Sequence, residues 1–83
     1  MIMEEKARFY ILQRYVPSMY IKYRGYMNND FYGKDEDGHE LYSLKKPENT
    51  MRFNSIGDAM RASADISVRT CMYYKVIPIY KLF

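Results

Sequence analysis

The chain has 83 residues, of which 48% are hydrophobic and 28% charged, and its formal net charge is +3. This size and composition indicate one small globular domain, residues 1–83, and exclude a disordered or fibrous chain. A single cysteine excludes an intramolecular disulfide, and no apolar run approaches the length of a membrane span. We expect residues 1–6 to be frayed and, since no secretory signal follows Met1, the protein to be cytoplasmic.

The first two expected strands are residues 8–15 and 19–26, which alternate in polarity and flank a break at Pro17. We predict that they form a hairpin. Alternation would place Phe9 and Ile11 on the face that meets a helix, with basic residues and tyrosines on the other face. Asn28-Asn29 reads as the turn that ends this hairpin, because asparagine tolerates left-handed backbone geometry.

A second hairpin is predicted around Asp35-Glu36-Asp37-Gly38, where Asp-Gly is a strong turn signal. Residues 39–44 would form the strand that follows this turn. A polar loop over residues 45–50, interrupted by Pro47, then leads away from the sheet.

One helix is predicted from an N-cap at Ser55 to about Val68. Its apolar face would include Ile56, Ala59 and Met60, so Met60 should be buried and Arg61 should not. The last strand, residues 72–77, is rich in Val, Ile and Tyr, and Pro78 assigns it to a sheet edge or a bulge.

The expected fold class follows from this order of elements. It is α+β, a small antiparallel sheet of three to five strands with one helix packed on one face. Because a chain this short has a thin core, we also expect a homodimer, formed through an edge strand or a tyrosine-rich face.

No residue set in the sequence spells out a reaction. His39 and Cys71 are the only histidine and cysteine, no motif joins them, and zinc would need four such ligands. The acidic turn at residues 35–40 lacks the ligand spacing of an EF-hand, so we interpret it as a solvated turn. We therefore predict that the protein is not an enzyme and has no catalytic residues, metal site or cofactor.

Basic residues interleaved with tyrosines are the remaining signal. Residues 6–27 hold five basic residues and no acidic one, and the chain contains ten tyrosines and no tryptophan. Tyrosine and arginine are favoured anchors at protein interfaces, whereas rings and cations on an open sheet also suit single-stranded nucleic acid. A third interpretation is an ordinary solvated sheet surface. The candidate binding residues are Arg8, Tyr10, Arg14, Tyr20, Lys22, Arg24, Tyr73 and Lys75.

Roughly residues 31–80 resemble a pattern found in many small phage and prophage proteins. The residues that carry the resemblance are Tyr32-Gly33, Asp37-Gly38, Leu41-Tyr42-Ser43, Met51-Arg52-Phe53, Ser55, Ala59 and Tyr74-Lys75-Val76-Ile77-Pro78. The chain departs from the pattern at Tyr42, where tryptophan is common, and at Thr50, where alanine is usual. The resemblance implies a host-takeover or counter-defence binder acting in the cytoplasm of a bacterial host.

Two functional hypotheses follow. In the first, the protein is a small non-enzymatic binder that inhibits or redirects a host defence factor through its basic, tyrosine-rich surface. In the alternative, it binds RNA or another single-stranded nucleic acid, and could use RNA as a bridge to inhibit a host RNA-processing toxin or nuclease.

Overall fold

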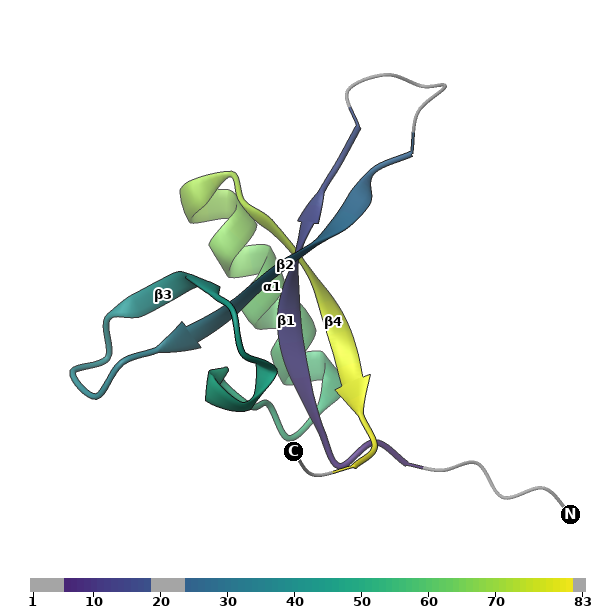
Figure 1. Cartoon of the computed structure of the whole chain (residues 1–83), viewed down its shortest axis with the longest axis vertical. Coiled ribbons are helices and arrows are strands. Elements are labelled where there is room, and N and C mark those ends of the chain that lie inside the picture. The colour runs from purple at the N-terminus through teal and green to yellow at the C-terminus, as the bar shows by residue number, and fades with distance from the viewer. Residues whose placement is uncertain (1–5, 19–23, 82–83) are drawn as a thin grey trace, which may run out of the picture.

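A computed structural model describes residues 6–18 and 24–81 and shows an α+β fold, as predicted. The strands are β1 (Phe9–Val16), β2 (Tyr26–Lys34), β3 (Glu40–Leu44) and β4 (Tyr73–Ile79), and the helix is α1 (Ile56–Thr70). They form one antiparallel sheet in the order β3-β2-β1-β4 (Figure 1). A short 3-10 turn, η1 (Pro47–Asn49), lies between β3 and α1.

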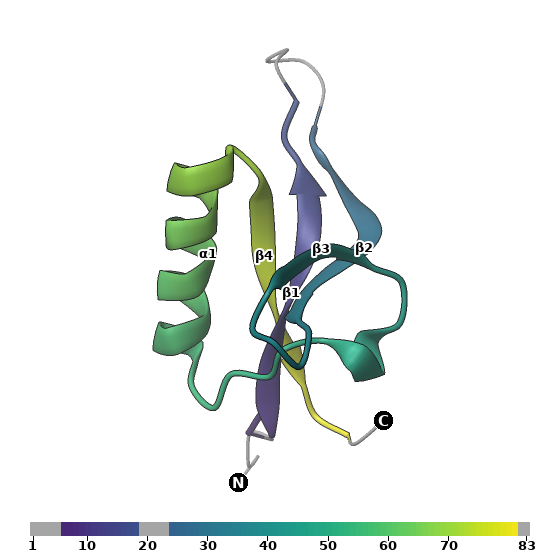
Figure 2. The ribbon, with the colours of Figure 1, turned by 90° about the vertical axis from the view of Figure 1, so that its left-hand side faces the viewer.

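The helix covers one face of the sheet, over β4 and β1, whereas η1 lies on the opposite side (Figure 2). Below the helix, Leu12 of β1 packs with Tyr74 of β4, Tyr32 of β2 and Ile66 of α1. A second buried cluster, built on Phe9, Ile11 and Phe31, lies on the other face. Since neighbouring residues of a strand point to opposite faces, the run Phe9-Tyr10-Ile11-Leu12 is buried on both sides of the sheet.

The predicted assignment of β1 to its two faces was therefore wrong. Tyr10 and Leu12 pack on the helix side, and Phe9 and Ile11 pack on the far side. The prediction assumed that only one face of this strand is apolar, but four consecutive apolar residues supply a core to both faces.

The first hairpin also differs from the prediction. β1 pairs with a strand that begins at Tyr26 and includes Asn28 and Asn29, so the predicted turn is part of β2. The partner segment contains the buried residues Phe31 and Tyr32, which give this pairing two core contacts. Residues 19–23, which the predicted second strand included, lie outside the described residues.

The predicted helix start is confirmed. The Ser55 hydroxyl accepts a hydrogen bond from the backbone N–H of Asp58 at 3.1 Å. The helix phase was partly wrong, because Ala59 and Ile66 are buried while Ile56 and Met60 are more than half exposed. The contact face is formed by Ala59, Ala62, Ser63 and Ile66, and Met60 lies beside this face.

The helix ends at Cys71, which has φ 59° and ψ 18° and donates its backbone N–H to the Ser67 carbonyl. This left-handed position favours glycine, because other residues place Cβ against the backbone there. We expect Cys71→Gly to stabilise the protein by about 0.5–1 kcal/mol. In the same urea titration, the control Ala64→Gly in the exposed helix interior should cost about 1 kcal/mol. A loss of stability in Cys71→Gly would contradict this account of the cap.

Two turn and edge predictions are confirmed. Gly38 has φ 82° in the Asp35–Gly38 turn between β2 and β3. β4 is an edge strand, as Pro78 indicated.

No helix in the described part of the chain is long and apolar enough to cross a membrane.

Candidate functional site

The predicted basic and tyrosine-rich residues do not lie on one surface. Tyr10 packs against the core under α1, and Arg14 pairs across the strands with the buried Tyr74 on that same side. The Arg14 guanidinium donates from Nη1 to the Met72 sulfur at 3.2 Å, and its Nε is buried with no hydrogen-bond partner among the described residues. Tyr10 and Arg14 were therefore assigned to the wrong face, because β1 alternates in the opposite phase.

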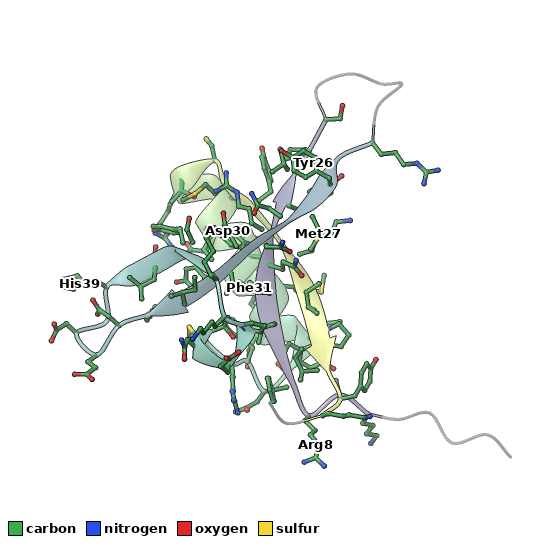
Figure 3. All side chains as sticks on the ribbon, in the orientation of Figure 1. Arg8, Tyr26, Met27, Asp30, Phe31 and His39 are labelled. Atoms are coloured by element: carbon green, nitrogen blue, oxygen red, sulfur yellow. The ribbon has the colours of Figure 1, made fainter. Side chains whose placement is uncertain are left out.

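Arg8 lies at the other end of the sheet, where its Nε donates to the Tyr80 carbonyl at 3.2 Å. Arg24 is exposed just before β2, and Tyr20 and Lys22 lie outside the described residues. Figure 3 shows Arg8 at the lower end of the sheet, well apart from Tyr26 and Met27. The eight predicted residues thus reduce to two that share a described surface, Tyr73 and Lys75.

Tyr73 and Lys75 belong to a patch on the face turned away from α1. Tyr73 pairs with Tyr15 of β1, and Tyr15 pairs in turn with Met27 of β2. Residues directly opposite each other on neighbouring strands point to the same face, so these three side chains form a row across the sheet. Lys75 lies one step along β4, with its Nζ 4.3 Å from the centre of the Tyr15 ring. We call Tyr15, Met27, Tyr73 and Lys75 the tyrosine patch.

The tyrosine patch is the open part of this face. Tyr73 is 49% exposed and Met27 is 38% exposed. The rest of the face is filled by the Phe9, Ile11 and Phe31 cluster, over which Leu44, Ile77 and Ile79 pack. Arg52 also lies over the Phe9 ring, at 4.4 Å from its centre. An apolar row with one cation at its border is therefore available to a partner at this end of the sheet.

Sequence reasoning missed Tyr15 and Met27. Tyr15 has the same strand phase as Phe9 and Ile11, which were expected under the helix, so it was not named as a surface residue. Met27 was placed outside the pairing because the predicted turn followed it. The continuous apolar run at residues 9–12 was the available signal, since it indicates a strand that is buried on both faces.

A network of charged and tyrosine side chains ties β3 to α1 on the helix side. Arg69 donates two hydrogen bonds to the Glu40 carboxylate, at 2.7 and 3.1 Å, and one to Asp65 at 2.8 Å. The Tyr42 hydroxyl also donates to Glu40, and the Tyr74 hydroxyl donates to the Tyr42 carbonyl at 2.6 Å. Fork-to-fork pairing of this kind fixes both partners, so the network anchors the short edge strand β3.

These contacts shift the pKa values of several side chains in the network. Hydrogen bonds from Arg69 and then Tyr42 lower the pKa of Glu40 to about 2. Burial, followed by the hydrogen bond with Glu40, raises the pKa of Tyr32 to about 12. A pocket of about 120 Å³ opens beside this network, and three of its four charged lining residues, Glu40, Asp65 and Arg69, are bonded to one another.

The network predicts a pH dependence of stability. Because the pKa of Glu40 is lowered from 4.5 to about 2 in the folded protein, its stabilising contribution is complete above its unfolded pKa and is lost as the pH falls toward 2. We expect wild type to be more stable than Glu40→Gln near neutral pH, and the difference to shrink as the solution is acidified. Urea midpoints of both proteins across this range would measure it. A difference that stays constant with pH would contradict the assignment.

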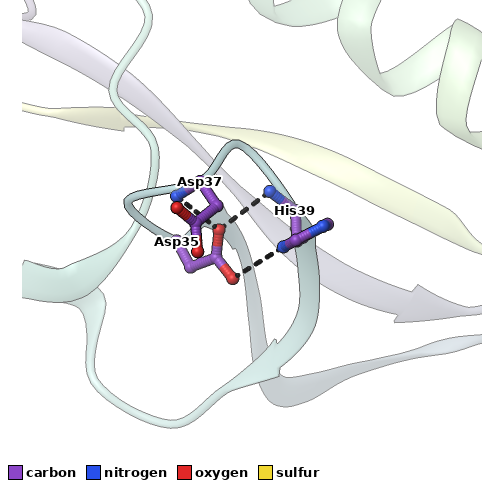
Figure 4. A group of neighbouring side chains, drawn as sticks. All are labelled: Asp35, Asp37 and His39. Carbon is purple, nitrogen blue, oxygen red and sulfur yellow. Dashed lines mark hydrogen bonds and ion pairs between the residues drawn. The ribbon is translucent and has the colours of Figure 1, made fainter.

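The second group of titratable side chains is Asp35, Asp37 and His39, whose ligand atoms lie within 4.8 Å of one another (Figure 4). The Asp35 carboxylate accepts hydrogen bonds from the backbone N–H groups of Asp37 and His39, at 2.9 and 2.8 Å, and lies 3.3 Å from His39 Nδ1. All three side chains are exposed. Asp35 is thus engaged in closing the β2–β3 turn.

No family model, curated protein or solved structure matches this chain. The resemblance to phage proteins therefore stays a prediction.

Proposed function

We propose that this protein is a small non-enzymatic binder that blocks or redirects a partner protein through the tyrosine patch. The observation that carries the proposal is the row of Tyr15, Met27 and Tyr73 on the open end of a sheet face. Tyrosine and methionine are enriched in the cores of protein interfaces, where they bury large apolar area. An adjacent cation such as Lys75 suits the polar rim of such a contact.

The distribution of cations favours a protein over a nucleic acid. A surface that tracks a single strand needs several cations beside its stacking rings. Arg14 contacts Met72 on the helix side, Arg8 lies at the far end, and Lys75 is stacked on Tyr15. Among the four residues of the patch, Lys75 is the sole cation. One cation is too few for repeated phosphate contacts but is sufficient for the polar rim of a protein interface.

The resemblance to host-takeover and counter-defence proteins supports a bacterial host protein as the class of partner. In that role a chain of 83 residues acts by occupying a surface of its target. The network at Glu40 and the tyrosine patch lie on opposite faces of the sheet. The anchoring of β3 therefore leaves the patch free for a partner.

Capture from a bacterial lysate tests the proposal. The immobilised protein is incubated with nuclease-treated lysate and, in parallel, with untreated lysate. Retained proteins are identified by mass spectrometry, and retained nucleic acid is detected by the ratio of absorbance at 260 nm to that at 280 nm. We expect one protein to be retained in near-equal amount to the bait. Retention of nucleic acid from an untreated lysate, with no stoichiometric protein from either, would favour the nucleic-acid alternative and overturn this proposal.

A further inference from the structure

The outer edge of β4 is a second feature of the same strand that carries Tyr73 and Lys75. Tyr10 of β1 exchanges both backbone hydrogen bonds with Phe53, on the side away from β4. On β4, the residue opposite Tyr10 is Pro78. Because the Tyr10 backbone groups point away from β4, this is a non-hydrogen-bonded pair, so the backbone groups of Pro78 point away from β1. The missing N–H of Pro78 therefore removes no bond from the β1–β4 ladder.

The same alternation sets the direction of the preceding backbone groups. Val76 and Tyr74 lie two and four residues before Pro78, so their N–H and C=O groups also point to the outer edge. The Tyr74 carbonyl accepts a hydrogen bond from the Ser63 hydroxyl at 2.6 Å. No strand lies beyond β4 in residues 6–18 and 24–81, so the N–H and C=O of Val76 and the C=O of Pro78 form an open strand edge.

A groove of about 380 Å³ runs beside this open edge on the helix side. Its apolar walls come from Ile56, Val76 and Pro78, with the rings of Tyr10 and Tyr80. Ile56 and Tyr80 are exposed, at 54% and 43%. In a strand added at the edge, every second side chain would point toward this groove, and the others would point toward the face that bears Tyr73 and Lys75.

Charge indicates what kind of segment fits. Lys6 is the one charged residue lining the groove among those described, and Lys75 lies on β4 itself. Arg8 is bonded to the carbonyls of Ile79 and Tyr80 at the end of the strand. The carboxylates of Glu40 and Asp65 are held by Arg69, toward the opposite edge of the sheet. The β4 edge is therefore basic and apolar, which complements an acidic and apolar strand.

We propose that the edge of β4 at Val76–Pro78 binds an extended, acidic segment of a partner protein by strand addition. An apolar side chain of that segment enters the groove, and a carboxylate meets Lys6. This inference rests on the proposed function, because it names how the partner engages the strand that carries Tyr73. Main-chain hydrogen bonds supply affinity in this mode, and the pockets for alternate side chains supply specificity.

The probe is a fluorescein-labelled peptide of alternating valine and glutamate, about eight residues long, to match an ordinary strand. Its binding is followed by fluorescence anisotropy. We expect the wild-type protein to bind it, and a peptide of alternating valine and lysine to bind at least about tenfold more weakly, a factor of ten being about 1.4 kcal/mol. Equal binding of the two peptides would overturn the charge argument and the proposal with it.

Two substitutions test the edge itself. Val76→Pro removes an outward N–H, so it should weaken binding about tenfold, the effect of one hydrogen bond. Pro78→Val adds an outward N–H that the ladder does not use, so it should tighten binding several-fold. Tyr26→Ala on β2, which does not line the groove, is the control and should leave peptide binding unchanged. If Val76→Pro fails to fold, two other measurements test the proposal. One is the affinity of Pro78→Val for the peptide, and the other is hydrogen exchange at the Val76 amide, which should be fast in the free protein and slow with bound peptide. Unchanged binding in Pro78→Val with fast Val76 exchange would overturn the proposal.

Two further outcomes separate this inference from the proposed function. Capture of a partner that depends on Tyr73, with no binding of the valine–glutamate peptide, would reject strand addition and leave the proposed function standing. Peptide binding without any captured partner would reject the proposed function instead. If Pro78→Val dimerises and the peptide does not compete, the occupant is a second copy of this chain, and the proposal of an acidic partner segment falls.

Discussion

Leu12→Ala is expected to destabilise the protein by about 3–5 kcal/mol. Leu12 has no exposed surface and lies in the core between β1, β4 and α1. Removing its branched end leaves a cavity that the surrounding residues Tyr32, Ile66 and Tyr74 fill only in part, and such changes fall in this range. Small domains have a free energy of unfolding of about 5–15 kcal/mol, so the variant should lose a large share of its stability. Thermal and urea unfolding followed by circular dichroism would measure the loss.

Met60→Ala is the matched control for that experiment. Met60 is 58% exposed, so its truncation should change the free energy of unfolding by less than about 0.5 kcal/mol. The sequence had suggested the reverse, a buried Met60 at the helix–sheet contact. If Met60→Ala were as damaging as Leu12→Ala, the helix phase described for α1 would be contradicted.

Tyr73→Ala is expected to weaken partner binding by about 2–4 kcal/mol, which is roughly 30- to 1000-fold. Tyr73 sits at the β4 end of the row with Tyr15 and Met27, and half of its surface is open. Truncating an aromatic anchor of this kind removes both its buried area and the exclusion of water around it. Titration calorimetry with the captured partner would measure the change.

Tyr26→Ala is the control for the binding experiment. Tyr26 is 62% exposed and next to Met27 in sequence, but it pairs with Val16, so it points to the other face of the sheet. Its truncation should leave affinity within a factor of about two, as expected for a residue outside the interface. Equal losses in Tyr73→Ala and Tyr26→Ala would indicate that the partner does not distinguish the two faces.

The sequence predicted the elements better than their faces. Ser55, Gly38 and Pro78 mark a helix start, a turn and an edge strand because each acts through local backbone chemistry. The assignment of faces depends on what covers the sheet. Leu44 packs on the side away from α1, and no local signal around it predicts that it helps to bury Phe9 and Phe31.

The candidate site was predictable only in part for the same reason. Tyr73 and Lys75 follow from the phase of β4, which faces the helix through Tyr74 and Val76 as expected. The contribution of β1 to the patch depends on the phase of a strand that is apolar at four successive positions, so the sequence alone could not choose between its two faces. Tyr15 joins the patch because Leu12, rather than Ile11, occupies the contact with α1.

Hydroxyl-radical footprinting of the purified complex tests the central claim most directly, because methionine, tyrosine and histidine side chains all react when exposed. Met27 and Tyr73 should be oxidised in the free protein and protected in the complex, whereas Tyr26 on the other face and His39 at the β2–β3 turn should react equally in both. Protection of His39 or Tyr26 with unchanged oxidation of Met27 and Tyr73 would contradict binding through the tyrosine patch.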